Sequence, residues 1–78
     1  YDIMLEPVDK NNVEYPAIII EFKVINKHKE DSLEETVQAA LKQIEEKKYD
    51  IELIKRGVKK ENIRHYGFAF RGREVLIG

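Results

Sequence analysis

The apolar positions of the chain follow two different periods, and the change of period separates the predicted strands from the predicted helices. Residues 17–24 read AIIIEFKV, a run of β-branched and aromatic residues that is typical of a strand. Pro16 is expected to begin this strand, so the predicted strand covers residues 16–24. The opening segment YDIMLEP predicts a shorter strand over residues 1–6 that ends before Pro7. Since a polar turn with Asn11 and Asn12 at its tip joins them, the two strands are expected to pair antiparallel.

Helical spacing replaces the strand pattern after residue 32. The apolar residues of this segment recur every three or four positions: Leu33, Val37, Ala40, Leu41 and Ile44. Ser32 and Glu35 have the spacing of a capping box, which marks the start of the helix. After the polar run EEKK, Asp50 is expected to cap a second short helix over residues 51–56, and Gly57 is expected to end it.

The last third of the chain returns to strand patterns after a loop over residues 58–62. Residues 63–70, IRHYGFAF, predict a third strand, and residues 73–77 predict a fourth after a tight turn at Arg71 and Gly72. A strand, a helical segment and a further strand form a crossover unit, which makes the second and third strands parallel. The sequence therefore predicts one α/β domain over residues 1–78, with the order β-β-α-α-β-β, a mixed sheet and helical cover on at least one face.

Two charged residues interrupt the most apolar strand. Glu21 and Lys23 are two positions apart, so their side chains point to the same face of the sheet. Burying an ionised side chain in such a strand costs several kcal/mol unless it is paired. The pair is either a same-face surface salt bridge or a functional site near the carboxyl end of a parallel strand, where α/β folds place their ligands.

Composition narrows the class of protein. Forty-two per cent hydrophobic and 37% charged residues are typical of a globular domain rather than a disordered chain. No apolar run reaches the roughly 20 residues of a membrane span. The chain has no cysteine, which excludes a disulfide framework and a cysteine metal site and fits a cytoplasmic protein. Residues 1–39 carry four Lys or Arg against nine Asp or Glu, a charge of −5, whereas residues 40–78 carry ten against six, a charge of +4.

The positions of the charged residues resemble a known nuclease motif. Asp2 on the first strand, eighteen intervening residues, and Glu21-Phe22-Lys23 on the second are similar to the D…E-x-K signature of the PD-(D/E)XK nuclease superfamily. Gln43, with Tyr49 six residues later, is similar to a Gln…Tyr feature of several branches. The amino-acid sequence of the whole chain most resembles the nuclease-like domain at the C-terminus of predicted bacterial and archaeal AAA-type ATPases. The resemblance implies a restriction-endonuclease-like fold lacking its usual first helix and strand.

This resemblance also implies roles for individual residues. Asp2, Glu21, Lys23 and Gln43 would be catalytic, and Asp2, Glu21 and the backbone carbonyl of Phe22 would hold Mg²⁺ or Mn²⁺. Lys23 would hold the attacking water or stabilise the transition state as a point charge. Gln43 would orient Lys23 or a phosphate.

The basic second half of the chain supplies candidates for contact with nucleic acid, most simply DNA. These are Lys47, Lys48, Tyr49, Lys55 and Arg56, with Lys59 and Lys60 nearby. Tyr49 lies about 240° around a straight helix from Gln43, so it can join the site only if the helix breaks before it. The other interpretation of the lysines is a solvated basic face.

Three functions therefore stay open: a metal-dependent nuclease domain, a nuclease-like binding or regulatory module with weak or no turnover, and a plain α/β interaction domain. The expected partners are nucleic acid and an AAA-type ATPase domain in the full-length protein, with no membrane. A further expectation is a homodimer, because the strand over residues 1–6 has an unpaired edge that invites pairing with a second copy.

Overall fold

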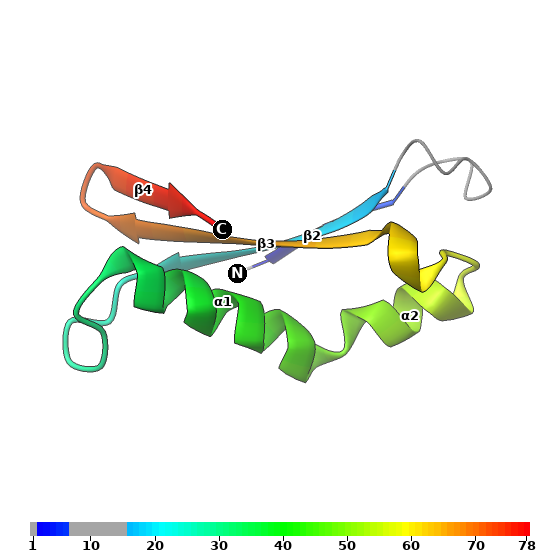
Figure 1. Ribbon diagram of the computed structural model, residues 1–78, viewed down its shortest axis with the longest axis horizontal. Coiled ribbons are helices and arrows are strands. Elements are labelled where there is room, and N and C mark those ends of the chain that lie inside the picture. The colour runs from blue at the N-terminus through cyan, green and yellow to red at the C-terminus, as the bar shows by residue number, and fades with distance from the viewer. Residues whose placement is uncertain (1, 7–15) are drawn as a thin grey trace.

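Strands and helices follow one another in the predicted order. The computed structural model describes residues 2–6 and 16–78; Tyr1 and the predicted turn over residues 8–15 lie outside this part. The elements are β1 (Asp2–Leu5), β2 (Ala17–Val24), α1 (Leu33–Lys47), α2 (Tyr49–Lys55), β3 (Ile63–Arg71) and β4 (Glu74–Ile77) (Figure 1). A short 3₁₀ helix, η1 (Lys60–Asn62), lies in a segment that was predicted to be a loop.

The described strands form one mixed sheet with the order β1-β2-β3-β4. β1 and β2 are antiparallel, β2 and β3 are parallel, and β3 and β4 are antiparallel, which confirms the predicted pairings. Asp2 is the register partner of Glu21, and Glu21 is in turn the partner of Gly67 on β3. The two acidic residues that the sequence placed on separate strands are therefore direct neighbours across the sheet.

The start of α1 agrees with prediction only in part. Ser32 is the N-cap, and its hydroxyl oxygen accepts a hydrogen bond from the Glu35 backbone N–H at 3.4 Å. The Glu35 carboxylate, however, accepts from the backbone N–H of Asp31 at 3.0 Å. In a capping box the Glu35 carboxylate would accept from the Ser32 N–H, but here it accepts from the preceding residue. Of the two predicted hydrogen bonds, the one to the Ser32 hydroxyl is therefore the one that forms.

The junction between the two helices differs from prediction. Lys48 lies between the helices as the C-cap of α1 and the N-cap of α2, and its backbone is left-handed with φ 56° and ψ 38°. Asp50 was expected to cap α2 but lies in its first turn, and its carboxylate lies 2.6 Å from His65 Nε2 on β3. An acidic residue in a first turn still favours the helix through the dipole. The left-handed residue, rather than a side-chain cap, makes the break.

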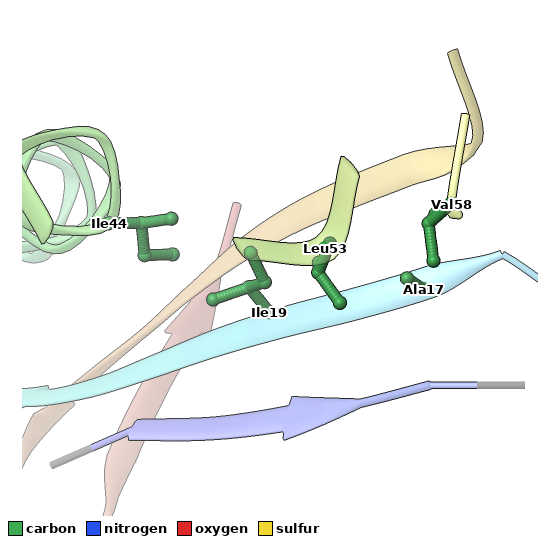
Figure 2. Close-up of a cluster of buried hydrophobic side chains, with 5 residues drawn as sticks. All are labelled: Ala17, Ile19, Ile44, Leu53 and Val58. Carbon is green, nitrogen blue, oxygen red and sulfur yellow. The ribbon is translucent and has the colours of Figure 1, made fainter. Parts of the chain in front are cut away.

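Both helices pack on the same face of the sheet, where the core lies (Figure 1). One cluster of buried side chains joins β2 to both helices and to the segment after α2: Ala17, Ile19, Ile44, Leu53 and Val58 (Figure 2). A second cluster of Leu33, Val37 and Ala69 holds the other end of α1. The two clusters fix α1 across β2 and β3, which contribute most of its contacts with the sheet.

α1 packs tightly against the sheet at Gly67. A Cβ atom built on this residue would lie 2.9 Å from the Val37 carbonyl oxygen and 3.1 Å from the Ala40 Cβ atom. Such distances to a helix backbone are too short for any side chain without a shift of the helix. Since Gly67 is the register partner of Glu21, the missing side chain lets α1 lie close to the carboxylate.

The opposite face of the sheet is apolar and is not covered by α1 or α2. Alternation places Ile20, Phe22, Tyr66, Phe68 and Phe70 on this face. The ring of Phe22 packs against those of Phe68 and Phe70, with centroid distances of 5.2 and 6.2 Å. Other members of the face are strongly exposed, including Leu5, Val24, Val75 and Ile77. We call this surface the outer face.

Candidate metal centre

Two carboxylates from neighbouring strands form the centre of the site. Asp2 and Glu21 are register partners in an antiparallel pair, so their side chains point to the same face, toward α1. Only 2% of the Glu21 side chain is exposed, whereas Asp2, at the edge of the sheet, keeps 27%. Like charges directly opposite each other destabilise a sheet. The pair therefore needs a cation beside it.

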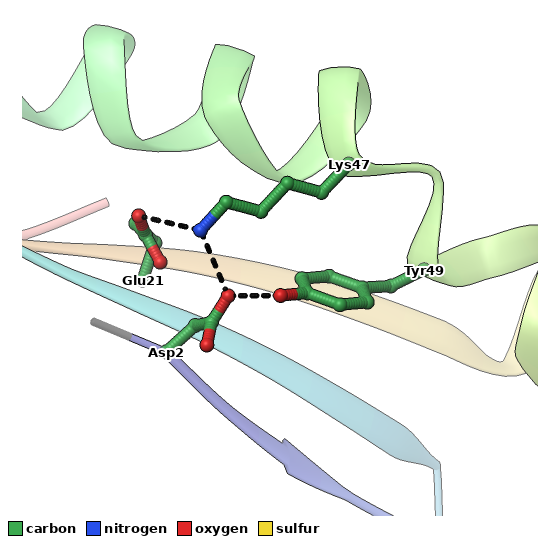
Figure 3. A network of polar contacts seen from close by, with 4 residues as sticks. All are labelled: Asp2, Glu21, Lys47 and Tyr49. Carbon is green, nitrogen blue, oxygen red and sulfur yellow. Dashed lines mark hydrogen bonds and ion pairs between the residues drawn. The ribbon is translucent and has the colours of Figure 1, made fainter.

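Lys47 supplies a positive charge to this pair. Its ammonium Nζ lies 3.0 Å from Asp2 Oδ2 and 3.4 Å from Glu21 Oε1, at the last residue of α1 (Figure 3). The hydrogen bond to Asp2, with the Glu21 and Asp2 charges, raises the pKa of the Lys47 ammonium. A cation at the C-terminus of a helix is also favoured by the helix dipole. One ammonium thus bridges both carboxylates.

Tyr49 completes the environment of Asp2. Its hydroxyl donates a hydrogen bond to Asp2 Oδ2, the oxygen that also contacts Lys47 (Figure 3). The Tyr49 bond first, and the Lys47 bond second, hold the pKa of the Asp2 carboxyl below its usual value. The same bond to an anion raises the pKa of the Tyr49 phenol. The required break before Tyr49 is present, because the left-handed Lys48 turns the chain back toward the sheet.

The other predicted site residues lie near this centre. Lys23 is half-buried and points to the same face as Glu21, two positions further along β2. The ring of Phe22 packs on the outer face, so only the backbone of this residue could contribute to the site. Gln43 is half-buried on α1, one helical turn before Lys47, and therefore lies on the same side of the helix.

The residues predicted to contact nucleic acid either have their polar atoms on carboxylates or are exposed to solvent. Lys47 and Tyr49, predicted on a basic surface, have their polar atoms on the carboxylates. Arg56 forms ion pairs with Glu6 and with Glu52, the latter at 3.0 Å. The remaining basic residues are exposed around α2 and η1: Lys48, Lys55, Lys59 and Lys60. We call these four lysines the basic surface.

The donor set fits a hard divalent cation with few protein ligands. Mg²⁺ binds one or two carboxylates and keeps several waters. Within residues 2–6 and 16–78, no cluster of three or more His, Cys, Asp or Glu side chains is arranged to hold a metal. The Asp2–Glu21 pair, with the Phe22 carbonyl as a third candidate oxygen, offers oxygen ligands of the kind that hard divalent cations take. The position of the Lys47 ammonium shows that the pair accepts a positive charge between its two carboxylates.

A comparison with protein families agrees with this arrangement. Metal-dependent phosphodiester hydrolysis uses carboxylates that hold a divalent ion, and Asp2 and Glu21 lie opposite each other across the sheet. The family model of the PD-(D/E)XK nuclease superfamily matches residues 1–78, so the chain belongs to that superfamily. Membership indicates a nuclease-like function. No curated protein and no solved structure matches the chain. Neither helix of the described chain is long and apolar enough to cross a membrane.

Lys47 is the residue of the centre whose place sequence reasoning missed. It was grouped with its neighbours in a lysine-rich run, where nothing distinguishes one flexible side chain from the next. One signal was available: Lys47 follows Gln43 by four positions, the spacing of neighbours on one helix face. A residue on the Gln43 face is directed at the strand that carries Glu21.

Proposed function

We propose that this domain is a metal-dependent nuclease that hydrolyses phosphodiester bonds, with DNA as the substrate class. The observation that carries the proposal is the Asp2–Glu21 pair, held on adjacent strands with a cationic group between the carboxylates. A buried glutamate at a register position opposite an aspartate is unfavourable for folding alone. Its presence is better explained by a ligand than by stability.

Each residue of the centre has a distinct part in this proposal. Asp2, Glu21 and the Phe22 carbonyl would hold Mg²⁺ or Mn²⁺, which when bound polarises the phosphoryl oxygen and activates water. Lys23, on the same face, would hold the attacking water or stabilise the charge that develops on the phosphate. Gln43 would orient Lys23 or the phosphate from α1.

Three substitutions test these roles. Glu21→Gln and Asp2→Asn remove a ligand charge and should lower Mg²⁺ affinity and cleavage together. Lys23→Ala should leave Mg²⁺ bound but suppress turnover. We would measure ion binding by calorimetry and cleavage on labelled single-stranded, double-stranded and branched DNA. Glu46→Gln, on an exposed glutamate of α1, is the matched control and should change neither quantity.

A surface salt bridge between Glu21 and Lys23 is not supported, because only 2% of the Glu21 side chain is exposed. If the charges of the centre served only to stabilise the fold, Glu21→Gln and Lys23→Ala would each lower the melting temperature, and Mg²⁺ would change neither result. A wild-type protein that gains no stability from millimolar Mg²⁺ and shows this pattern would refute the proposed metal centre.

The basic surface is the proposed contact for the DNA backbone. If Lys48, Lys55, Lys59 and Lys60 neutralise phosphates, the affinity for a short duplex should fall steeply with salt. The log–log slope is about 0.9 for each phosphate neutralised. Replacing Lys59 and Lys60 by Gln should reduce that slope by about 2 if both contact phosphates. An unchanged slope would leave them as a solvated face.

A binding module without turnover is the second candidate. The observation that favours it is the Lys47 ammonium, which offsets one of the two carboxylate charges without a metal ion. Retained DNA affinity with no cleavage under any divalent ion would support this candidate over a nuclease. From the resemblance of the sequence we further propose an AAA-type ATPase domain as its neighbour in the full-length protein.

A further inference from the structure

The position of Lys47 has a consequence for any ion at the carboxylate pair. Its ammonium lies 3.0 Å from Asp2 Oδ2 and 3.4 Å from Glu21 Oε1, between the two groups that would bind the metal (Figure 3). A Mg²⁺ ion bound to the same oxygens would lie about 2.0–2.1 Å from each. The ion and the ammonium would then be like charges within a few ångströms, in a site where Glu21 is buried. Both cannot occupy the pair.

We propose that Lys47 is a built-in counter-cation that holds the carboxylate pair in the metal-free protein and leaves it when a divalent ion binds. This inference rests on the proposed metal centre. Lys47 sits at the end of α1 on a flexible stem, and 34% of its side chain is exposed. The ammonium can therefore turn outward without unfolding the helix. Tyr49 retains its own hydrogen bond to Asp2, so that carboxylate stays oriented after the exchange.

The released ammonium links two ligands of the same site. Once it leaves the carboxylates, Lys47 is a free positive charge at the edge of the metal centre, near where a phosphate would bind. A divalent ion should therefore raise the affinity for a phosphate-bearing ligand in two ways. The ion itself attracts the phosphate, and the Lys47 ammonium that it displaces adds a second positive charge. In the metal-free protein Lys47 offsets one of the two carboxylate charges, which limits repulsion between Asp2 and Glu21.

Lys47→Met is the first test, because methionine keeps most of the side-chain stem and removes the charge. Lys42→Met is the matched control, since it removes the same charge from an exposed residue of the same helix. By calorimetry, Lys47→Met should bind Mn²⁺ at least about tenfold more tightly than wild type, because a competing unit charge is gone. Lys42→Met should stay within about twofold of wild type. Without ion, Lys47→Met should melt at a lower temperature than Lys42→Met.

The outcomes separate this inference from the metal centre itself. Equal or weaker Mn²⁺ binding by Lys47→Met, with clear binding by wild type, overturns the inference and leaves the metal centre standing. No binding by wild type or by either variant overturns both. If Lys47→Met does not fold, NMR of the wild-type protein tests the exchange instead. On saturation with Mg²⁺ the side-chain NMR signals of Lys47 should shift well beyond those of Lys48, and unmoved Lys47 signals overturn the exchange.

Discussion

Replacing Gly67 by alanine should destabilise the domain, although strand propensity predicts the reverse. The added Cβ atom would lie 2.9 Å from the Val37 carbonyl oxygen and 3.1 Å from the Ala40 Cβ atom. Overpacking of this kind costs about 1–3 kcal/mol, because a helix backbone must move. Against it stands a gain of about 0.4–1 kcal/mol from the lower entropy of the unfolded chain. We expect a net loss of about 0–2.6 kcal/mol.

Urea unfolding followed by circular dichroism measures this loss by linear extrapolation. In a domain of this size each kcal/mol corresponds to about 4–8 °C in melting temperature. Gly67→Val sharpens the test, because valine is the better strand residue but has the larger side chain. If the contact with α1 limits stability, the protein with glycine should be the most stable, the alanine variant less stable and the valine variant the least stable. If valine is the most stable of the three, the close packing of α1 on Gly67 does not limit stability and the reasoning fails.

Two further predictions concern Asp2 and the junction between the two helices. Because the pKa of Asp2 is lowered in the folded protein, its contribution to stability should be complete above its usual value of 3.8 and be lost as the pH falls through the lowered value. Tyr49→Phe removes the main cause and should make urea stability less sensitive to pH in that acid range; an unchanged profile would contradict the hydrogen bond. Lys48→Gly should stabilise the protein by about 0.5–1 kcal/mol, since the residue is left-handed, whereas Lys48→Ala, with the same loss of charge, should not. Equal effects of the two Lys48 substitutions would assign the change to charge instead.

The sequence predicted what short-range periodicity controls. Alternation put Glu21 and Lys23 on one face, and the crossover rule put residues 16–24 parallel to residues 63–70, which the structure confirms. The sequence also put Asp2 and Glu21 on neighbouring antiparallel strands, but their direct pairing depends on the register of those strands, which only the structure gives. The junction of the helices was harder. Asp50 looked like a cap in sequence, but a left-handed lysine makes the break, and lysine carries no signal for that conformation.

The contact of Lys47 was unpredictable for a different reason. A lysine chain reaches far from its backbone, so its target depends on the tertiary approach of α1 to the sheet. That approach is set by Gly67, twenty positions later in the chain, and by the two core clusters. The fold could therefore be predicted largely from local pattern, whereas the charge arrangement of the centre required the packing of the helix.

The outer face affects how experiments on this domain should be designed. It exposes Leu5, Val24, Val75 and Ile77 in the native four-stranded sheet. Dyes that fluoresce on apolar surfaces are used as markers of molten globules. Here such a dye would bind the native sheet, and its signal would start high and fall on unfolding. Melting curves of the variants should therefore follow backbone ellipticity, because dye fluorescence would report occupancy of the outer face rather than loss of the fold.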